Sequence, residues 1–282
     1  MINPTTPTLG RNRLLLIGLD GVRLDTLREA RTPNIDTISA AGFFAPVEVS
    51  RQAPSASGAS WSTIATGVWP AKHGVIENDF VDHRLADFPD FLSRLRHEVP
   101  GLKTYVGVAW PPLVDDVPGP VYQGGGVLAD TGNGGVADDD RTAVSAAKAL
   151  SDGSVHVSFL HFDLCDHIGH EQGPGPAYTA AVEDSDHRIG LVLKGIQARP
   201  SYAEEDWTYV VTTDHGHRDG GGHGGDSDAE RTAWIAASGP GVPSTPPRSL
   251  EQVDIHAHAL SVFGVDPAPD WQLDGRPFGR DD

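Results

Sequence analysis

Short apolar runs recur along the chain and mark its predicted strands. Residues 14–19 (LLLIGL) are continuously apolar and end at Asp20. Similar runs occupy residues 104–109, 155–161 and 207–213, and a shorter candidate lies at 233–238. Unbroken apolar runs of this length are typical of strands that are buried on both faces of a sheet. The pattern therefore predicts a set of interior strands.

Between these runs, apolar residues recur at helical spacing. Thr32-Pro33 precedes one such segment, which ends before Gly42, as expected for a helix start and stop. Further helical patterns lie at 88–97, 138–150 and 176–197. Strands that alternate with helices predict a mostly parallel sheet with helices on both faces. The predicted fold class is therefore α/β.

Acidic and histidine side chains directly follow several predicted strands. Asp20 follows the first strand, Asp163 and Asp166 follow the third, and Asp214-His215 follows the fourth. In a parallel sheet the carboxyl ends of the strands meet at one edge, where ligands bind. We therefore expect these side chains to converge on one site.

Composition is that of a soluble globular protein. The chain has 282 residues, 38% of them hydrophobic and 21% charged. We expect a single catalytic domain over residues 1–282, because α/β enzymes of this size are often one unit. The formal net charge of −18 and the absence of any Lys/Arg-rich run argue against polymeric nucleic acid as a partner.

The cysteine content and the hydropathy indicate the cellular compartment. Cys165 is the only cysteine, so no intrachain disulfide can form, which fits a reducing compartment. No stretch approaches the roughly 18 apolar residues of a membrane span. We expect a cytoplasmic protein without a membrane partner.

The Asp and His residues have spacings that suit metal binding. Asp166 and His170 are four residues apart, so both lie on one side of a helical turn. Adjacent Asp214 and His215 are followed by His223, whose glycine neighbours allow a close approach to an ion. Two divalent ions about 4 Å apart can clamp the attacking and leaving oxygens of a phosphoester.

A hydroxyl-rich segment, PSASGASWSTIATG at 54–67, supplies candidate nucleophiles. Any of its serines could instead cap a helix. The residue pattern alone does not choose between Ser55, Ser57 and Ser60.

Together, these segments resemble the type I phosphodiesterase/nucleotide pyrophosphatase branch of the alkaline phosphatase superfamily. The pieces occur in the family's order over nearly the whole chain. They are LLLIGLDGVRLDTL (14–27), TPNID (32–36), STIATGVWPAKHGVIEN (62–78), DHIGHEQGPG (166–175), TTDHG (212–216) and GGHGG (221–225). The resemblance implies an alkaline-phosphatase-like three-layer α/β/α sandwich.

The resemblance also implies a nucleophile and two metal ions. The nucleophile falls nine residues before Thr66, at Ser57. One ion is then held by Asp20, Asp214 and His215 and contacts Ser57. The other is held by Asp166, His170 and His223. Zinc is the usual ion of the family and manganese is the alternative.

Two positions depart from the family pattern. Gly58 stands where an aromatic residue commonly stacks a nucleobase, so nucleotide specificity is in doubt. Ser60 stands where an Asn commonly donates to a phosphate oxygen, and its hydroxyl can still donate one hydrogen bond. Sulfatases share the fold but need Pro and Arg where this chain has Ala59 and Trp61.

The expected function is hydrolysis of a small phosphorylated substrate by a phosphodiesterase or nucleotide pyrophosphatase mechanism, through a phosphoserine on Ser57. The alternatives are a phosphomonoesterase or phosphonate hydrolase, a phosphotransferase or mutase with the same intermediate, and a non-catalytic binding protein. His217, His256 or His258 could replace His223 as a ligand. The substrate's identity and the oligomeric state are not indicated by the sequence.

Overall fold

A computed structural model describes residues 9–115, 121–122, 129–130 and 136–279. Its centre is a seven-stranded sheet in the order β2-β7-β6-β1-β5-β3-β4. The strands are β1 (Asn12–Leu19), β2 (Gly42–Glu48), β3 (Thr104–Val108), β4 (Ala129–Asp130), β5 (Val157–Phe162), β6 (Asp206–Thr213) and β7 (Thr232–Ser238). Only β7 runs antiparallel to its neighbours β2 and β6, so the sheet is mostly parallel, as predicted.

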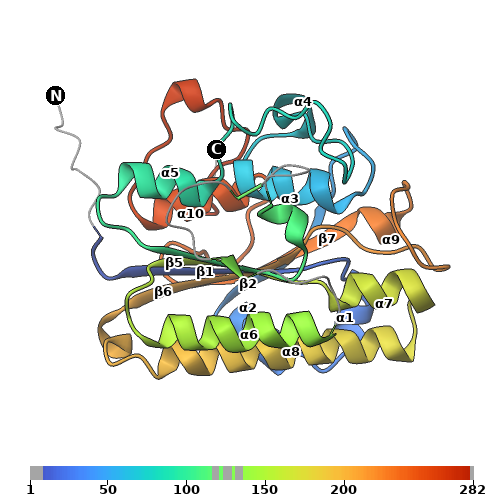
Figure 1. Ribbon diagram of the computed structural model, residues 1–282, viewed down its shortest axis with the longest axis horizontal. Helices are drawn as coiled ribbons and strands as arrows, with labels where there is room; N and C mark the ends of the chain where they lie inside the picture. Colours follow the sequence, from blue (N-terminus) through green and yellow to red (C-terminus); the bar gives the residue numbers. More distant parts are fainter. Residues whose placement is uncertain (1–8, 116–120, 123–128, 131–135, 280–282) are drawn as a thin grey trace.

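Helices cover both faces of this sheet (Figure 1). One face carries α1 (Leu24–Glu29), α2 (Pro33–Ala40), α6 (Val136–Ser151), α7 (Leu164–Gln172) and α8 (Pro176–Gln197). The other carries α3 (Ser57–Thr66), α4 (Pro70–His73), α5 (Phe91–Glu98) and α10 (Asp254–Val262). The short α9 (Asp228–Arg231) precedes β7, and 3₁₀ turns lie at Pro111–Leu113, Tyr202–Glu204 and Pro269–Trp271. The predicted three-layer α/β/α sandwich is confirmed.

The two helical layers enclose two hydrophobic cores, and β1 contributes to both. Leu14 and Leu16 join the core under α3, α5 and α10, whereas Leu15 and Ile17 join the core under α6 and α8. Successive side chains of a strand point to opposite faces. A strand that is covered on both sides therefore favours apolar residues on both faces, which explains the unbroken run that predicted β1.

The strands that carry the acidic residues are direct neighbours. Leu19, the last residue of β1, lies opposite Phe162 of β5 on one side and Thr213 of β6 on the other. All three strands are parallel, so the residues that follow them leave the sheet at the same edge. This register brings Asp20, the start of α7 and Asp214 together.

The sequence pattern missed the strand β2 and placed the start of one helix too early. β2 is an edge strand among the described residues, and an edge strand tolerates a proline such as Pro46, which lacks an N–H. The helix predicted at 88–97 begins only at Phe91, because the Asp90 carboxylate caps it by accepting from Leu92 N and Ser93 N.

Within the described part of the chain, no helix is both long and apolar enough to cross a membrane.

Candidate metal centre

Ser57 is the first residue of α3, and its hydroxyl faces the ligands predicted for the first ion. Its Oγ lies 3.1 Å from His215 Nε2 and 3.3 Å from Asp20 Oδ1. The other hydroxyls of this segment are placed differently. Ser55 is engaged by the backbone of the glycine loop, since its Oγ donates to Gly225 O and accepts from Gly224 N. Ser57 is thus the hydroxyl directed at the acidic edge.

Ser60 lies three residues after Ser57 on α3 and is buried. Residues at this spacing share one side of a helix. Among the described residues, the Ser60 hydroxyl makes no hydrogen bond to another predicted site residue. A role for Ser60 towards phosphate stays a prediction.

The second predicted ligand set assembles around Asp166 on α7. His170, one turn later, places its Nε2 3.4 Å from Asp166 Oδ2. His223 places its Nε2 3.5 Å from Asp166 Oδ1, while its Nδ1 lies 2.5 Å from Ser55 O. The carbonyl of Ser55 therefore orients the ring so that Nε2 turns towards Asp166 and His170. The donor atoms of all three residues lie within 4.8 Å of one another, as for ligands of one ion.

Asp214 provides the clearest sign that a cation belongs here. Its Oδ1 accepts a hydrogen bond from Gly21 N at 3.0 Å. Its Oδ2 is buried without a hydrogen-bond partner among the described residues, although His215 Nε2 lies 3.2 Å away. An orphaned, buried carboxylate oxygen beside an imidazole nitrogen is costly unless a cation joins the two. The residues present therefore fit a divalent ion.

The pKa shifts of the carboxyl and imidazole groups in the site agree with cation binding. Burial, followed by the charge of Asp20, raises the pKa of both Asp166 and Asp214 well above the ordinary range. Burial lowers the pKa of His215 to about 4 and that of His223 to about 2. The imidazoles are therefore neutral at physiological pH and offer lone pairs, whereas the clustered carboxylates need positive charge to ionise together.

The two predicted ligand sets are not separate in space. Asp20, Asp166 and His215 also have donor atoms within 4.8 Å of one another. Asp166 therefore lies between the set that contains Ser57 and the set that contains His223. This closeness suits two ions about 4 Å apart.

Two residues outside the predicted ligand sets hold Asp20 in place. Trp61 donates from Nε1 to Asp20 Oδ2 at 2.9 Å, and His161 Nε2 lies 2.9 Å from the same oxygen. A side chain at Gly18 would collide with the Trp61 ring, since its Cβ would fall 2.2 Å from Cη2. Trp61 follows Ser57 by one helical turn, and that spacing is the sequence signal that could have indicated a shared role.

Three other histidines were candidates for the place of His223 as a metal ligand, and their surroundings differ. His256 Nδ1 is 2.6 Å from Ala65 O, and His258 stacks on Phe278 with ring centroids 4.1 Å apart. Both belong to α10 and pack into the core. His217 does reach the site, with Nε2 3.0 Å from Asp166 Oδ1, but it falls outside the group formed by Asp166, His170 and His223.

We predict that His223→Ala removes one equivalent of metal per chain, because the substitution deletes one of three donors from the Asp166 set. His256→Ala and His258→Ala are the matched controls, since they remove buried imidazoles elsewhere. Metal content by inductively coupled plasma mass spectrometry measures the effect. Loss of metal from a control variant, with full content in His223→Ala, would show that the ligand is misassigned.

Known proteins share both the sequence pattern and the fold. The family model for type I phosphodiesterase / nucleotide pyrophosphatase matches residues 14–233. The human GPI ethanolamine phosphate transferase 3 catalytic subunit is 35% identical over 107 residues, which are 37% of this chain and 9% of that protein. The chain thus spans about a tenth of the length of this curated relative.

Solved structures with the same fold are more distant in sequence. Murine ectonucleotide pyrophosphatase/phosphodiesterase 5 superimposes with a TM-score of 0.69 at 15% identity, over 92% of this chain and 96% of that one. A putative sulfatase from Bacteroides thetaiotaomicron gives 0.73 at 15% identity, over 95% and 74%. These likenesses establish the shared fold, and the family model spans most of the chain. The chain therefore belongs to the type I phosphodiesterase/nucleotide pyrophosphatase family, a family of phosphoric ester hydrolases.

Proposed function

We propose that this chain hydrolyses a small phosphodiester through a phosphoserine formed on Ser57, at a centre that holds two divalent ions. One observation carries the proposal: the Ser57 hydroxyl lies between His215 Nε2 and Asp20 Oδ1, at 3.1 and 3.3 Å, at the first residue of a buried helix. A hydroxyl between two ligands of one ion is placed to bind that ion as the alkoxide.

The residues that would hold the ions follow from the site. Asp20, Asp214 and His215 would hold the ion beside Ser57, and Asp166, His170 and His223 would hold the other. When bound, the two ions stabilise the Ser57 alkoxide and neutralise charge on the phosphate oxygens. We expect zinc, with manganese as the alternative, because mixed carboxylate and imidazole ligands suit both.

The protein's own groups then position the reaction. Ser57 Oγ attacks phosphorus in line with the leaving alcohol, the bond to that alcohol breaks, and the phosphoryl group is transferred to Oγ. Water on the opposite side then displaces Ser57 and releases the phosphate product. The amino end of α3 faces the reacting group, and the partial positive charge of a helix amino end favours a phosphate there. Catalysis is mainly positioning and charge neutralisation.

The surroundings of Gly58 bear on the substrate. Its N–H donates to Asn78 Oδ1 at 2.8 Å. A Cβ at position 58 would fall 2.9 Å from Glu77 O and 3.2 Å from Phe80 Cζ. The 77–80 segment thus fills the space into which an aromatic side chain at 58 would project. We therefore propose a substrate whose recognition does not depend on stacking of a base at this position.

We predict weak dependence on a nucleobase. Catalytic efficiencies for bis-p-nitrophenyl phosphate and p-nitrophenyl thymidine monophosphate should lie within about tenfold, because stacking one base contributes roughly 1–3 kcal/mol where a platform exists. p-Nitrophenyl phosphate should be a poorer substrate than bis-p-nitrophenyl phosphate. A hundredfold preference for the thymidine ester would contradict this prediction, and a preference for the monoester would favour a phosphomonoesterase.

Transfer to an alcohol is the second candidate function, and the curated relatives favour it. They include GPI ethanolamine phosphate transferases, named for moving a phosphoethanolamine group rather than hydrolysing it. The same phosphoserine would be discharged by an alcohol instead of water. Product analysis with and without ethanol or glycerol separates the two: phosphorylated alcohol as the main product at low acceptor concentration would favour a transferase.

A further inference from the structure

The candidate metal centre is open to solvent on the side of His170. The side chain of His170 is 50% exposed, whereas Asp20 and His215, which face Ser57, are buried. The Nε2 atom of His170 is directed at Asp166, 3.4 Å from its Oδ2, so that Nδ1 is the ring nitrogen on the outer side. A substrate therefore reaches the centre from the side on which His170 Nδ1 lies.

Arg218 lies on this open side. Its Nε donates to Gly221 O at 3.0 Å, within a turn in which its backbone N–H donates to Gly222 O. Gly222 N donates to Gly169 O at 3.3 Å, which ties the turn to α7, the helix that carries His170. A Cβ at Gly222 would fall 3.2 Å from Arg218 Nη2 and 3.7 Å from His170 Nδ1. The guanidinium and the outer nitrogen of His170 therefore border the same small space.

The guanidinium of Arg218 forms no ion pair with a carboxylate in the ranges that the structure describes. The acidic residues near it in sequence are engaged elsewhere. Asp219 and Asp226 each pair with another arginine, at 2.8 and 2.9 Å. Glu230 accepts from the backbone N–H of Gly225 at 2.7 Å. Because the chain has 39 acidic residues and only 21 Lys and Arg, an arginine that stays unpaired beside an acidic centre points to an acceptor from outside the chain.

The outer nitrogen of His170 needs an acceptor as well. When Nε2 binds an ion, Nδ1 carries the ring proton. A histidine that binds a metal almost always donates this second N–H to a carboxylate, a backbone carbonyl or water. His170 Nδ1 makes no hydrogen bond to any described residue, and Arg218 beside it is itself a donor. Two donors therefore face one space, and an anion in that space would accept from both.

We propose that Arg218 and His170 Nδ1 bind a carboxylate on the leaving alcohol of the substrate, an inference that rests on the proposed diester hydrolysis. A carboxylate has two oxygens, one for each donor. Of two ions that clamp an in-line displacement, the one away from the nucleophile stabilises the leaving oxygen. His170 is a proposed ligand of that ion, so a group beyond His170 contacts the leaving alcohol. The substrate class is therefore a phosphodiester whose leaving group is a hydroxy acid.

The test compares leaving groups that differ in charge. Methyl 4-(carboxymethyl)phenyl phosphate and methyl 4-(carbamoylmethyl)phenyl phosphate release phenols of similar basicity, because a methylene separates the ring from the carboxylate or the amide. The corresponding 3-substituted pair tests a second reach. We expect kcat/KM for the carboxylate ester to exceed that for the amide by about tenfold or more at one ring position at least, as for a hydrogen bond to a charged group. Water as the acceptor of both donors would instead give no preference.

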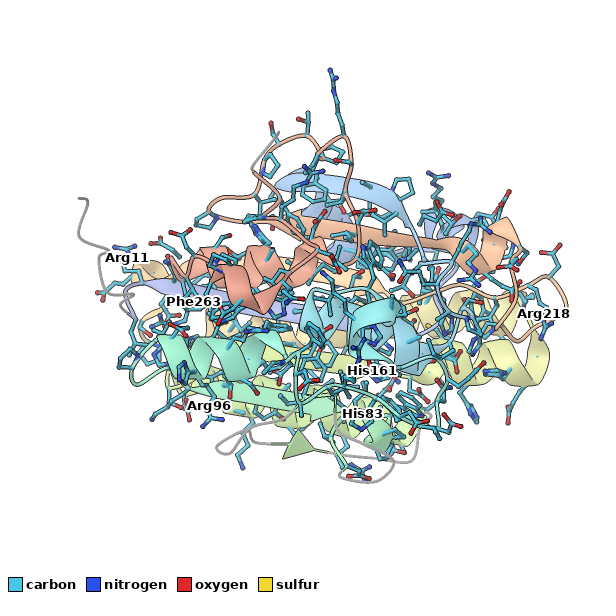
Figure 2. The ribbon with its side chains drawn as sticks, turned by 90° about the horizontal axis from the view of Figure 1, so that it is seen from above. Arg11, His83, Arg96, His161, Arg218 and Phe263 are labelled. Carbon is cyan, nitrogen blue, oxygen red and sulfur yellow. The ribbon has the colours of Figure 1, made fainter. Side chains whose placement is uncertain are left out.

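Substitution of Arg218 assigns the preference to its guanidinium. Arg218→Gln should abolish the preference, and Arg218→Lys, which keeps the charge but not the planar set of donors, should retain part of it. Arg11→Gln is the matched control and should keep the full preference. Arg11 is exposed like Arg218 and lies at the opposite end of the molecule (Figure 2).

Binding is measured apart from turnover. Metal-loaded Ser57→Ala lacks the proposed nucleophile, so the Kd of each ester can be determined by isothermal titration calorimetry. The carboxylate ester should bind about tenfold more tightly than the amide, because the hydrogen bonds to its charge are absent from the amide. The double variant Ser57→Ala/Arg218→Gln should bind both esters equally.

Each outcome bears on one of the two proposals. Equal efficiency for the charged and neutral esters at both ring positions, or a preference that persists in Arg218→Gln, would overturn the carboxylate subsite and leave diester hydrolysis intact. Failure to hydrolyse these esters and bis-p-nitrophenyl phosphate would instead contradict the proposed function, and the binding comparison in Ser57→Ala would still decide the subsite. The comparison of esters in the unaltered chain decides the matter even where a variant does not fold.

Discussion

Ser57→Ala is expected to lower kcat/KM for bis-p-nitrophenyl phosphate by at least about a thousandfold, since losing the nucleophile removes the covalent route altogether. The lost atom lies 3.1 Å from His215 Nε2 and 3.3 Å from Asp20 Oδ1, so the substitution deletes the reacting group and leaves the carboxylate and imidazole donors in place. Metal content should therefore stay near that of the unaltered chain. Steady-state kinetics and metal analysis on the same preparation measure both quantities.

Ser55→Ala and Ser60→Ala are the matched controls, because they remove hydroxyls from the same segment. Ser55 supports the loop that carries His223, so its loss should reduce activity moderately through that loop. Ser60 is expected to affect binding of phosphate more than chemistry. An inactive Ser60→Ala variant together with an active Ser57→Ala variant would show that the nucleophile is wrongly assigned.

Removal of metal is expected to abolish activity, and added Zn²⁺ or Mn²⁺ should restore it. Asp20 and Asp214 are buried and Asp166 is half-buried, and without cations the charges of Asp20 and Asp166 oppose ionisation of Asp214. The midpoint of thermal unfolding should fall as well, because a ligand that binds only the folded state stabilises it by about 4 kcal/mol at a thousandfold excess over Kd.

The experiment compares activity and thermal unfolding before chelation, after chelation, and after each metal is returned. Magnesium and calcium are useful controls, since both prefer oxygen-only ligand sets. Full activity in a chain shown to be free of metal would contradict the two-ion centre. Restoration by calcium alone would contradict the proposed role of the histidines as ligands.

The interior of the fold could be predicted from the sequence because its strands are covered on both faces. β1 and β5 are buried along almost their whole length, and such positions favour a mainly apolar run, although β5 also buries Ser158 and His161. β2 could not be found in the same way. It pairs only with β7, its burial alternates, and Pro46 interrupts its pattern.

The outline of the site was predictable for a different reason. Asp20 and Asp214 each follow a strand directly, so a correct reading of the strands places them at one edge. Contacts that depend on the packing of α3 against β1 were not predictable. The spacing of Trp61 one helical turn after Ser57 hints at a shared role, but Trp61 reaches Asp20 only because Gly18 leaves room for its ring, and no spacing rule links positions 18, 20 and 61.

The identity of the nucleophilic hydroxyl could be predicted only in part from the residue pattern. The residue pattern left Ser55, Ser57 and Ser60 open, and the family resemblance selected Ser57. The geometry adds an independent reason, because Ser57 begins α3 and faces Asp20 and His215, whereas Ser55 is bonded to the glycine loop. Likewise, His223 was one of several candidate ligands until its position beside Asp166 and His170 distinguished it from His256 and His258.

A covalent phosphoserine on Ser57 is the central claim, and trapping it is the most direct test. The metal-loaded chain is mixed with bis-p-nitrophenyl phosphate, quenched in acid within one turnover, digested and analysed by tandem mass spectrometry. The account predicts one esterified phosphoryl group on Ser57, absent from Ser57→Ala and from the chelated chain. Turnover with no phosphorylated peptide, or with the phosphoryl group on Ser55, Ser60 or Ser62, would contradict it.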